Sequence, residues 1–108
     1  MKLSVVTPTH KGTYLNELYD SLKNQTYENW EWLLYLNGGL RKDDLSSEII
    51  NDPRVNIHHD IKTPLSTNVG YLKNKAFHIA TGDILVEVDH DDVITPDCLE
   101  ETARGFEN

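Results

Sequence analysis

The stretch Ile84-Leu85-Val86-Glu87-Val88-Asp89-His90-Asp91-Asp92 joins a short apolar run to three carboxylates within four residues. Gly82-Asp83 and the acidic cluster bound the run, which predicts a strand buried on both faces, as in parallel sheets. In open α/β sheets, ligands bind just beyond the carboxyl ends of such strands. Neighbouring carboxylates repel one another unless a cation, hydrogen bonds or water offset their charge. The stretch predicts a site for a hard cation that carries a phosphorylated ligand, and the alternative is a solvated acidic turn that caps the next helix.

Three apolar runs upstream predict further strands, over residues 3–7, 32–36 and 54–58. Pro8 is expected to end the first of them, because proline cannot donate a hydrogen bond to a central ladder. Asn37-Gly38-Gly39 ends the second. The alternation of strands with helical segments predicts right-handed crossovers and a parallel sheet. Together with a switch point between the first and fourth strands, where the loops converge, it predicts the strand order 3-2-1-4. With helices on both faces, this is a three-layer α/β fold.

Four helical segments separate or follow these strands. Thr13 is placed to N-cap the first, whose apolar residues recur at helical spacing: Leu15, Leu18, Tyr19 and Leu22. A polar helix is expected over about residues 43–51, and a third from residue 66 or 67 to a C-terminal Gly82. Thr95-Pro96 is expected to start the last helix, with threonine as the cap and proline at the first helical position.

Composition limits the class of protein. The 108 residues suffice for one domain, residues 1–108, and 38% hydrophobic with 26% charged residues suits a soluble globular domain. A net charge of −8 argues against nucleic acid as a partner, because phosphate-backbone binding needs a basic face. No stretch approaches the roughly 20 apolar residues of a membrane span. Cys98 is the only cysteine, so we expect a cytoplasmic protein, or a domain at the cytoplasmic face of a membrane within a longer protein.

Several segments, in a fixed order along the chain, resemble those of a known family. They are Val5-Val6-Thr7-Pro8-Thr9-His10, residues 22–31, Lys73-Asn74, Ala80-Thr81-Gly82-Asp83, Val88-Asp89-His90-Asp91-Asp92 and Pro96. The ordered set resembles family 2 glycosyltransferases with the Rossmann-like GT-A fold, over essentially the whole chain. The resemblance implies metal-dependent transfer of a sugar, with inversion, from a nucleotide-diphosphate sugar to an acceptor hydroxyl.

The resemblance also implies roles for particular residues. In that family the Pro-Thr loop and the loop after the second strand hold the base, a basic residue approaches the diphosphate, and the Asp-X-Asp motif holds ribose and a divalent metal. The implied donor-binding residues are Pro8, Thr9, His10, Asn37, Lys73, Asp89 and His90. Asp91 is the implied principal metal ligand, with Asp89 directed to ribose or metal, Mn²⁺ or Mg²⁺ as the ion, and a UDP-sugar as the donor.

Two positions depart from the family pattern. Leu36-Asn37 stands where an acidic pair is usual, so a carboxylate that commonly reads the base is missing. Lys73 stands where arginine is usual, which keeps the positive charge but loses the bidentate fork.

The general base of an inverting transfer is not apparent in this sequence. In the resembled family this carboxylate comes from a segment well after the Asp-X-Asp strand, and here only residues 93–108 follow. We expect the chain to be truncated at its C-terminus, with the base beyond residue 108, so that the chain alone binds a donor weakly and transfers no sugar. The acceptor, whether a glycan, a lipid or another hydroxyl compound, is not identified by the sequence.

The sequence also has features of other classes of protein. A nucleotide-sugar or metal-binding domain without catalysis stays open as an alternative. A phosphoryl-transfer domain like the haloacid dehalogenases is a weaker alternative. In those enzymes the Asp-X-Asp motif closes the first strand and needs a downstream lysine, whereas here it follows the fourth predicted strand and only Arg104 follows it as a basic residue. A calcium loop fails at its sixth position, Ile94, which is not glycine. His58-His59 does not make a zinc site, because adjacent strand residues face opposite sides.

Overall fold

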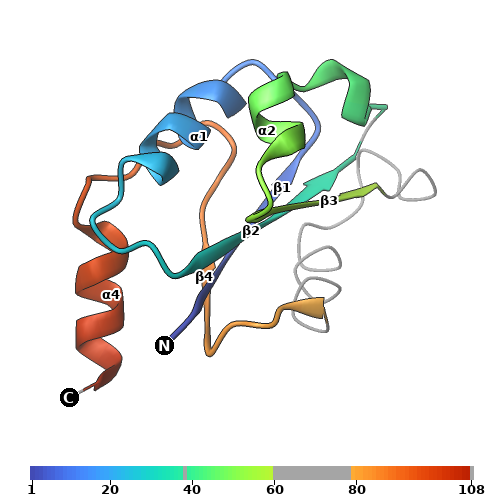
Figure 1. The fold of residues 1–108 in the computed structure, drawn as a ribbon. Helices are drawn as coiled ribbons and strands as arrows, with labels where there is room; N and C mark the ends of the chain where they lie inside the picture. The colour runs from blue at the N-terminus through green and yellow to red at the C-terminus, as the bar shows by residue number, and fades with distance from the viewer. Residues whose placement is uncertain (38, 60–78, 108) are drawn as a thin grey trace.

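The computed structural model describes residues 1–37, 39–59 and 79–107. Its elements, in chain order, are β1 (Leu3–Thr9), α1 (Leu15–Lys23), β2 (Trp30–Leu36), the 3₁₀ helix η1 (Lys42–Asp44), α2 (Ser47–Asn51), β3 (Val55–His59), β4 (Ile84–Glu87) and α4 (Cys98–Glu107). The strands form one sheet in the order β3-β2-β1-β4, and every pair is parallel (Figure 1). The predicted α/β class and the strand order 3-2-1-4 are confirmed. Within the described part of the chain, no helix has the length and apolar character needed to cross a membrane.

The larger core lies between one face of the sheet and the helices. Strand residues such as Val5, Trp32 and Leu34 pack there against α1, α2 and α4. The predicted stripe of α1 is confirmed, since its buried residues are Leu15, Leu18, Tyr19 and Leu22. On the other face, Val6, Leu33 and Tyr35 form a second buried cluster with Ala80 and Leu85 beside it. Most of the helix predicted from residue 66 or 67 to Gly82 lies outside the described residues.

β1 continues through Pro8 to Thr9, so the prediction that Pro8 ends this strand is wrong. In a parallel ladder, the N–H and C=O of one residue point to the same neighbouring strand, and successive residues alternate. Thr9 O accepts from Asn37 N on the β2 side, whereas Val6 O accepts from Val88 N on the β4 side. By this alternation the backbone of Pro8 faces β4. The pairing between β4 and β1 ends at Val6↔Glu87, before Pro8 is reached. The missing N–H therefore falls where the ladder has already stopped.

β4 is less buried than the sequence suggests. Ile84, Leu85 and Val86 are each only half-buried, and Glu87 is exposed. The predicted burial on both faces is wrong, because β4 lies at the end of the sheet order with β1 as its one neighbour in the described sheet. An apolar run reports hydrophobicity, but it does not report how many strands lie beside it.

The helix starts also differ from the predictions. α1 begins at Leu15 with Tyr14 as its N-cap, and no side chain caps it, so Thr13 is not the cap. The predicted helix over residues 43–51 divides into η1 and a short α2, whose N-cap Ser46 accepts from Ile49 N. α4 begins at Cys98 rather than at Thr95-Pro96.

Candidate functional site

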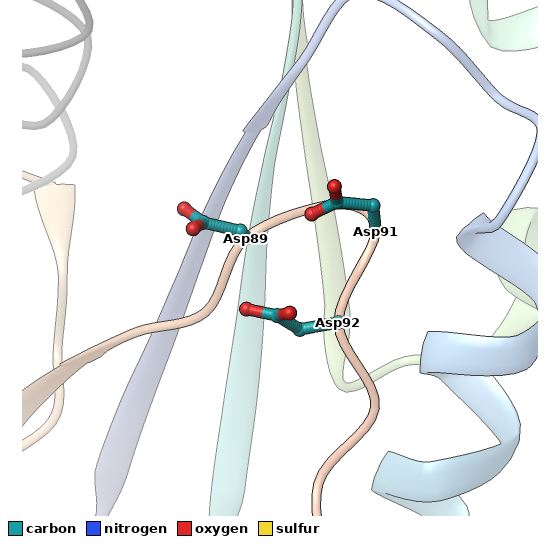
Figure 2. A group of neighbouring side chains, drawn as sticks. All are labelled: Asp89, Asp91 and Asp92. Carbon is teal, nitrogen blue, oxygen red and sulfur yellow. The ribbon is translucent and has the colours of Figure 1, made fainter.

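The acidic cluster occupies a turn directly after β4, at the carboxyl end of the sheet. Val88 N donates to Val6 O (3.1 Å), which ties the start of the turn to β1. Asp92 N then donates to Asp89 O (3.1 Å) and closes the turn. Figure 2 shows the carboxylates of Asp91 and Asp92 pointing back toward Asp89. One carboxylate oxygen from each of the three side chains lies within 4.8 Å of the other two.

This spacing fits a small divalent cation. Two oxygens bound to one Mg²⁺ at 2.0–2.1 Å are at most about 4.2 Å apart, and a Ca²⁺-sized ion allows somewhat more. All three side chains are exposed, so small side-chain rotations suffice to bring the oxygens to those separations. Among the described residues, no lysine or arginine forms an ion pair with any of them. Carboxylate oxygens are also the donors that Mg²⁺ and Mn²⁺ prefer.

A hydrogen bond joins the acidic turn to the end of β1. The Thr9 hydroxyl lies 2.7 Å from the carbonyl oxygen of Lys11 and 2.7 Å from Nδ1 of His90. A hydroxyl has one proton, and a carbonyl oxygen can only accept, so the hydroxyl donates to Lys11 O. Nδ1 of His90 must then carry a proton and donate to Thr9. In neutral His90 this leaves Nε2 as the ring nitrogen with the free lone pair.

A hollow of about 280 Å³ adjoins the acidic turn. Its lining residues are Pro8, His10, Asp89, His90 and Asp91. The rings of His10 and His90 lie 5.2 Å apart, centroid to centroid, at an interplanar angle of 45°. The structure thus brings five of the predicted site residues to one place, from two segments that are about eighty positions apart in sequence.

The other predicted residues lie elsewhere or outside the described part. Thr9 is buried and does not line the hollow; it contacts the site through His90. Asn37 is also buried. It lies beside Thr9, since its N–H donates to Thr9 O (2.8 Å). Lys73 lies outside the described residues. Asp92 was not among the predicted ligands, although its place in the same run of carboxylates was the available signal.

A larger hollow of about 530 Å³ lies away from the acidic turn. Its lining residues are Tyr19, Lys23, Glu48, Asn51, Asp52, Pro53 and Arg54. Lys23 pairs with Glu48 (3.0 Å) and Arg54 with Asp52 (3.3 Å), so its charged groups satisfy one another. Burial alone would raise the pKa of Asp52, but hydrogen bonds from Arg54 and Tyr19 lower it. This hollow is therefore a region of paired charges, and the acidic turn is the better candidate for a ligand site.

Comparison with known proteins identifies the family. Residues 4–108 match the model of the family described as Glycosyl transferase family 2. The chain belongs to this family. It is 31% identical over 94 residues to the putative glycosyltransferase EpsH of Bacillus subtilis, an alignment that covers 85% of the chain and 26% of EpsH. The chain thus spans about a quarter of the length of that relative.

Solved structures share the fold of this chain. TarS 1–349 of S. aureus in complex with UDP-GlcNAc is 25% identical with a TM-score of 0.83, over 99% of this chain and 31% of that one. The mannosyltransferase PcManGT of Pyrobaculum calidifontis, in complex with GDP-Man and Mn²⁺, is 20% identical with a TM-score of 0.78, over 99% and 32%. The sheet and helices described above therefore have the fold of these solved structures, and the family is Glycosyl transferase family 2.

Proposed function

We propose that this family 2 chain binds the nucleotide-diphosphate sugar of a metal-dependent, inverting glycosyl transfer. The observation that carries the proposal is the set of three exposed carboxylates within 4.8 Å, beside a hollow at the carboxyl end of the sheet. A nucleoside diphosphate is an anion, and an acidic site binds it only when a cation reverses the local field. The acidic Asp-X-Asp turn is thus expected to hold the metal first and the diphosphate through it.

Each residue of the site has an assigned part in this proposal. Asp91 and Asp89 hold the ion as an Asp-X-Asp pair, and Asp92 adds a third carboxylate. Pro8 and His10 line the wall of the hollow. Nε2 of His90 accepts a hydrogen bond from a hydroxyl group of the nucleotide sugar or from a bound water. When bound, a divalent cation would offset the negative charge that develops on the departing nucleoside diphosphate.

The donor and the ion are narrower proposals. TarS was solved with UDP-GlcNAc and also with UDP, so a UDP-sugar is the first donor to test here. PcManGT was solved with Mn²⁺, which makes Mn²⁺ the first ion and Mg²⁺ the second. Asn37 and Lys73 are assigned to the base and the diphosphate by family resemblance. The acceptor hydroxyl and the general base belong to the whole protein, of which this chain is expected to be the donor-binding domain, residues 1–108.

We infer a cytoplasmic setting, in which nucleotide sugars and Mg²⁺ would be at hand. The single, half-buried Cys98 supports a reducing compartment, because no intrachain disulfide can form. A longer protein would be able to place the same domain at the cytoplasmic face of a membrane.

Calorimetric titration tests the donor proposal. UDP and UDP-GlcNAc are titrated into the chain with Mn²⁺, with Mg²⁺ and with EDTA. We expect binding with either ion and at least tenfold weaker binding with EDTA, and Asp91→Asn should remove the metal dependence. Asp43→Asn is the matched control, because it removes the same charge from an exposed position in η1. Equal binding with and without metal would refute the proposal.

Enzymatic turnover separates transfer from binding alone. The chain and a longer form of the protein are incubated with UDP-GlcNAc and candidate acceptors, and released UDP is measured. We expect metal-dependent binding by both and turnover by the longer form only. Turnover by neither, with binding intact, would favour a nucleotide-sugar-binding domain without catalysis.

A further inference from the structure

Gln25, just after the C-terminus of α1, makes an unusual set of contacts for a buried amide. Its side-chain Nε2 donates to Ser21 O (3.0 Å) and to Thr95 O (2.7 Å), and Oε1 accepts from Leu99 N (3.0 Å). The residue is buried, and both of its N–H groups are used. One side chain thus joins α1, the segment that follows the acidic turn, and the first turn of α4.

The acidic turn is consequently held at both of its ends. Before it, Val88 N donates to Val6 O of β1. After it, Gln25 holds Thr95, Ser21 Oγ accepts from Ile94 N (3.4 Å), and the backbone N–H of Thr26 donates to Pro96 O (2.8 Å). Only the residues between Val88 and Ile94 lie between these anchors. Because this span is so short, the separation of the anchors restricts the turn.

Gln25 also explains why α4 starts where it does. The first N–H groups of a helix have no partner inside the helix and need a cap. Thr95 was the predicted cap, but the Gln25 amide oxygen caps Leu99 N from another element. The same amide therefore fixes the start of α4 and the exit of the acidic turn, and it couples them to α1.

We propose that Gln25 is a positioning residue for the metal site. By holding Thr95 against α1, it keeps the carboxylates of Asp89, Asp91 and Asp92 close enough together for small rotations to bring them onto one divalent cation. This inference rests on the proposed metal site, although Gln25 contacts neither metal nor donor. Partners that orient metal ligands from behind typically change metal affinity by about 10–100-fold when they are removed.

Two substitutions separate the contacts. Gln25→Ala removes all three hydrogen bonds, whereas Gln25→Glu keeps the length of the side chain and the acceptor for Leu99 N but loses both donors. The control is Thr26→Val, which removes the Thr26–Glu100 side-chain hydrogen bond (3.0 Å) between the same two regions but keeps the Gln25–Thr95 contact. Mn²⁺ affinity is measured by calorimetry at a temperature where circular dichroism shows every variant folded.

We expect Mn²⁺ to bind about tenfold more weakly to both Gln25 variants and unchanged to Thr26→Val. Gln25→Glu should retain the helical signal of α4, which shows that the loss comes from the turn rather than from unfolding. If the wild type and both Gln25 variants bind Mn²⁺ equally while Asp91→Asn does not bind it, the Gln25 proposal is overturned and the metal site stands.

A second readout does not depend on the metal. The Asp92 amide closes the acidic turn by donating to Asp89 O, so its hydrogen exchange reports the order of the turn. We expect faster exchange at Asp92 in Gln25→Glu than in Thr26→Val, with Val88 unchanged. If the wild type binds no Mn²⁺, the proposed function fails, and hydrogen exchange at Asp92 still decides whether Gln25 orders the turn. Unchanged exchange at Asp92 in Gln25→Glu would overturn the ordering role of Gln25.

Discussion

The carboxylates at the two ends of the sheet differ in burial and in their partners. At the amino end, Glu31 of β2 is buried and accepts hydrogen bonds from Ser4 Oγ (2.6 Å), Thr81 N (2.7 Å) and Thr81 Oγ1 (3.0 Å). Lys2 Nζ lies 3.5 Å from the same carboxylate. At the carboxyl end, the three aspartates after β4 are exposed, and no basic side chain in the described residues pairs with them. The first carboxylate is fully engaged in structure, whereas the other three remain available to a ligand.

The difference shows how one fold separates stability from binding. Burial alone would raise the pKa of Glu31, but the hydrogen bonds from Ser4 and Thr81 and the charge of Lys2 lower it. The carboxylate therefore stays ionised and holds the turn before β4 in place. The carboxyl end carries like charges close together, which is unfavourable until a cation arrives. We expect mutations at the amino end to change folding and mutations at the carboxyl end to change binding.

The largest expected effect is from Glu31→Ala. Removing this carboxylate leaves the buried Ser4 hydroxyl and the Thr81 N–H without their acceptor, so the free energy of unfolding should fall by about 3 kcal/mol. Urea denaturation measures the change, and Glu28→Ala, at an exposed position two residues before β2, is the control. Mn²⁺ affinity of the folded variant should not change. If Glu31→Ala lowers the free energy of unfolding no more than Glu28→Ala does, the carboxylate at the amino end is not the structural one and the contrast between the two ends of the sheet is wrong.

Gly82→Ala tests the close packing of the same region. A Cβ at this position would lie 2.8 Å from Lys2 O and 2.8 Å from Ser4 N, and would also meet the Ser4 hydroxyl. These are mostly backbone atoms, so we expect a loss of about 2 kcal/mol in denaturant unfolding. Gly105→Ala is the matched control, since nothing lies near its Cβ position, and in α4 it should stabilise by roughly 0.5–1 kcal/mol. Equal effects at the two glycines would contradict the packing seen here.

Asp92→Asn tests the carboxyl end. We expect Mn²⁺ to bind about tenfold more weakly, or ~1.4 kcal/mol, because one of three candidate oxygen ligands loses its charge. Unfolding in EDTA should show no loss of stability, since one like charge has been removed. Calorimetry and urea denaturation measure the two quantities. A variant that unfolds more easily yet binds Mn²⁺ normally would reverse the roles assigned to the two ends.

The smallest effect is expected in the pH dependence of stability. Because the folded pKa of Glu31 is below its ordinary value of 4.5, the unfolded chain binds this proton more readily. Its stabilising contribution is therefore complete above that value and is lost as the pH falls through the lowered folded pKa. Glu31→Gln should flatten this part of the profile below about pH 4.5 relative to the wild type. Parallel profiles from urea denaturation across this range would contradict the assignment.

Local patterns predicted much of the fold and part of the site. The stripe of α1 and the strand order were correct, because side-chain periodicity and strand–helix alternation report directly on burial and topology. The closeness of Asp89 and Asp91 was predictable because it follows from sequence adjacency, and Asp92 was available from the same run. These features need no knowledge of the rest of the chain.

Features that depend on distant contacts were not predictable in this way. The Thr9–His90 hydrogen bond joins residues 81 positions apart, and no spacing rule indicates it. The start of α4 depends on Gln25, 74 positions from Leu99, so the local Thr95-Pro96 signal failed. The half-burial of β4 likewise depends on its place in the sheet rather than on its composition. Long-range hydrogen bonds and the place of a strand in the sheet decided these details.

Pro8 affects how the sheet assembles as well as how it ends. If β4 slipped forward by two residues, Glu87 would lie opposite Pro8, and one ladder hydrogen bond would have no donor. The correct register is thereby favoured during folding, before any ligand is present. Beyond the last pair with β4, Val6↔Glu87, the same missing donor also makes the β4-facing side of β1 at Pro8 a poor template for a strand from another molecule. Pro8 thus disfavours both misregistered pairing with β4 and pairing with a strand from another molecule.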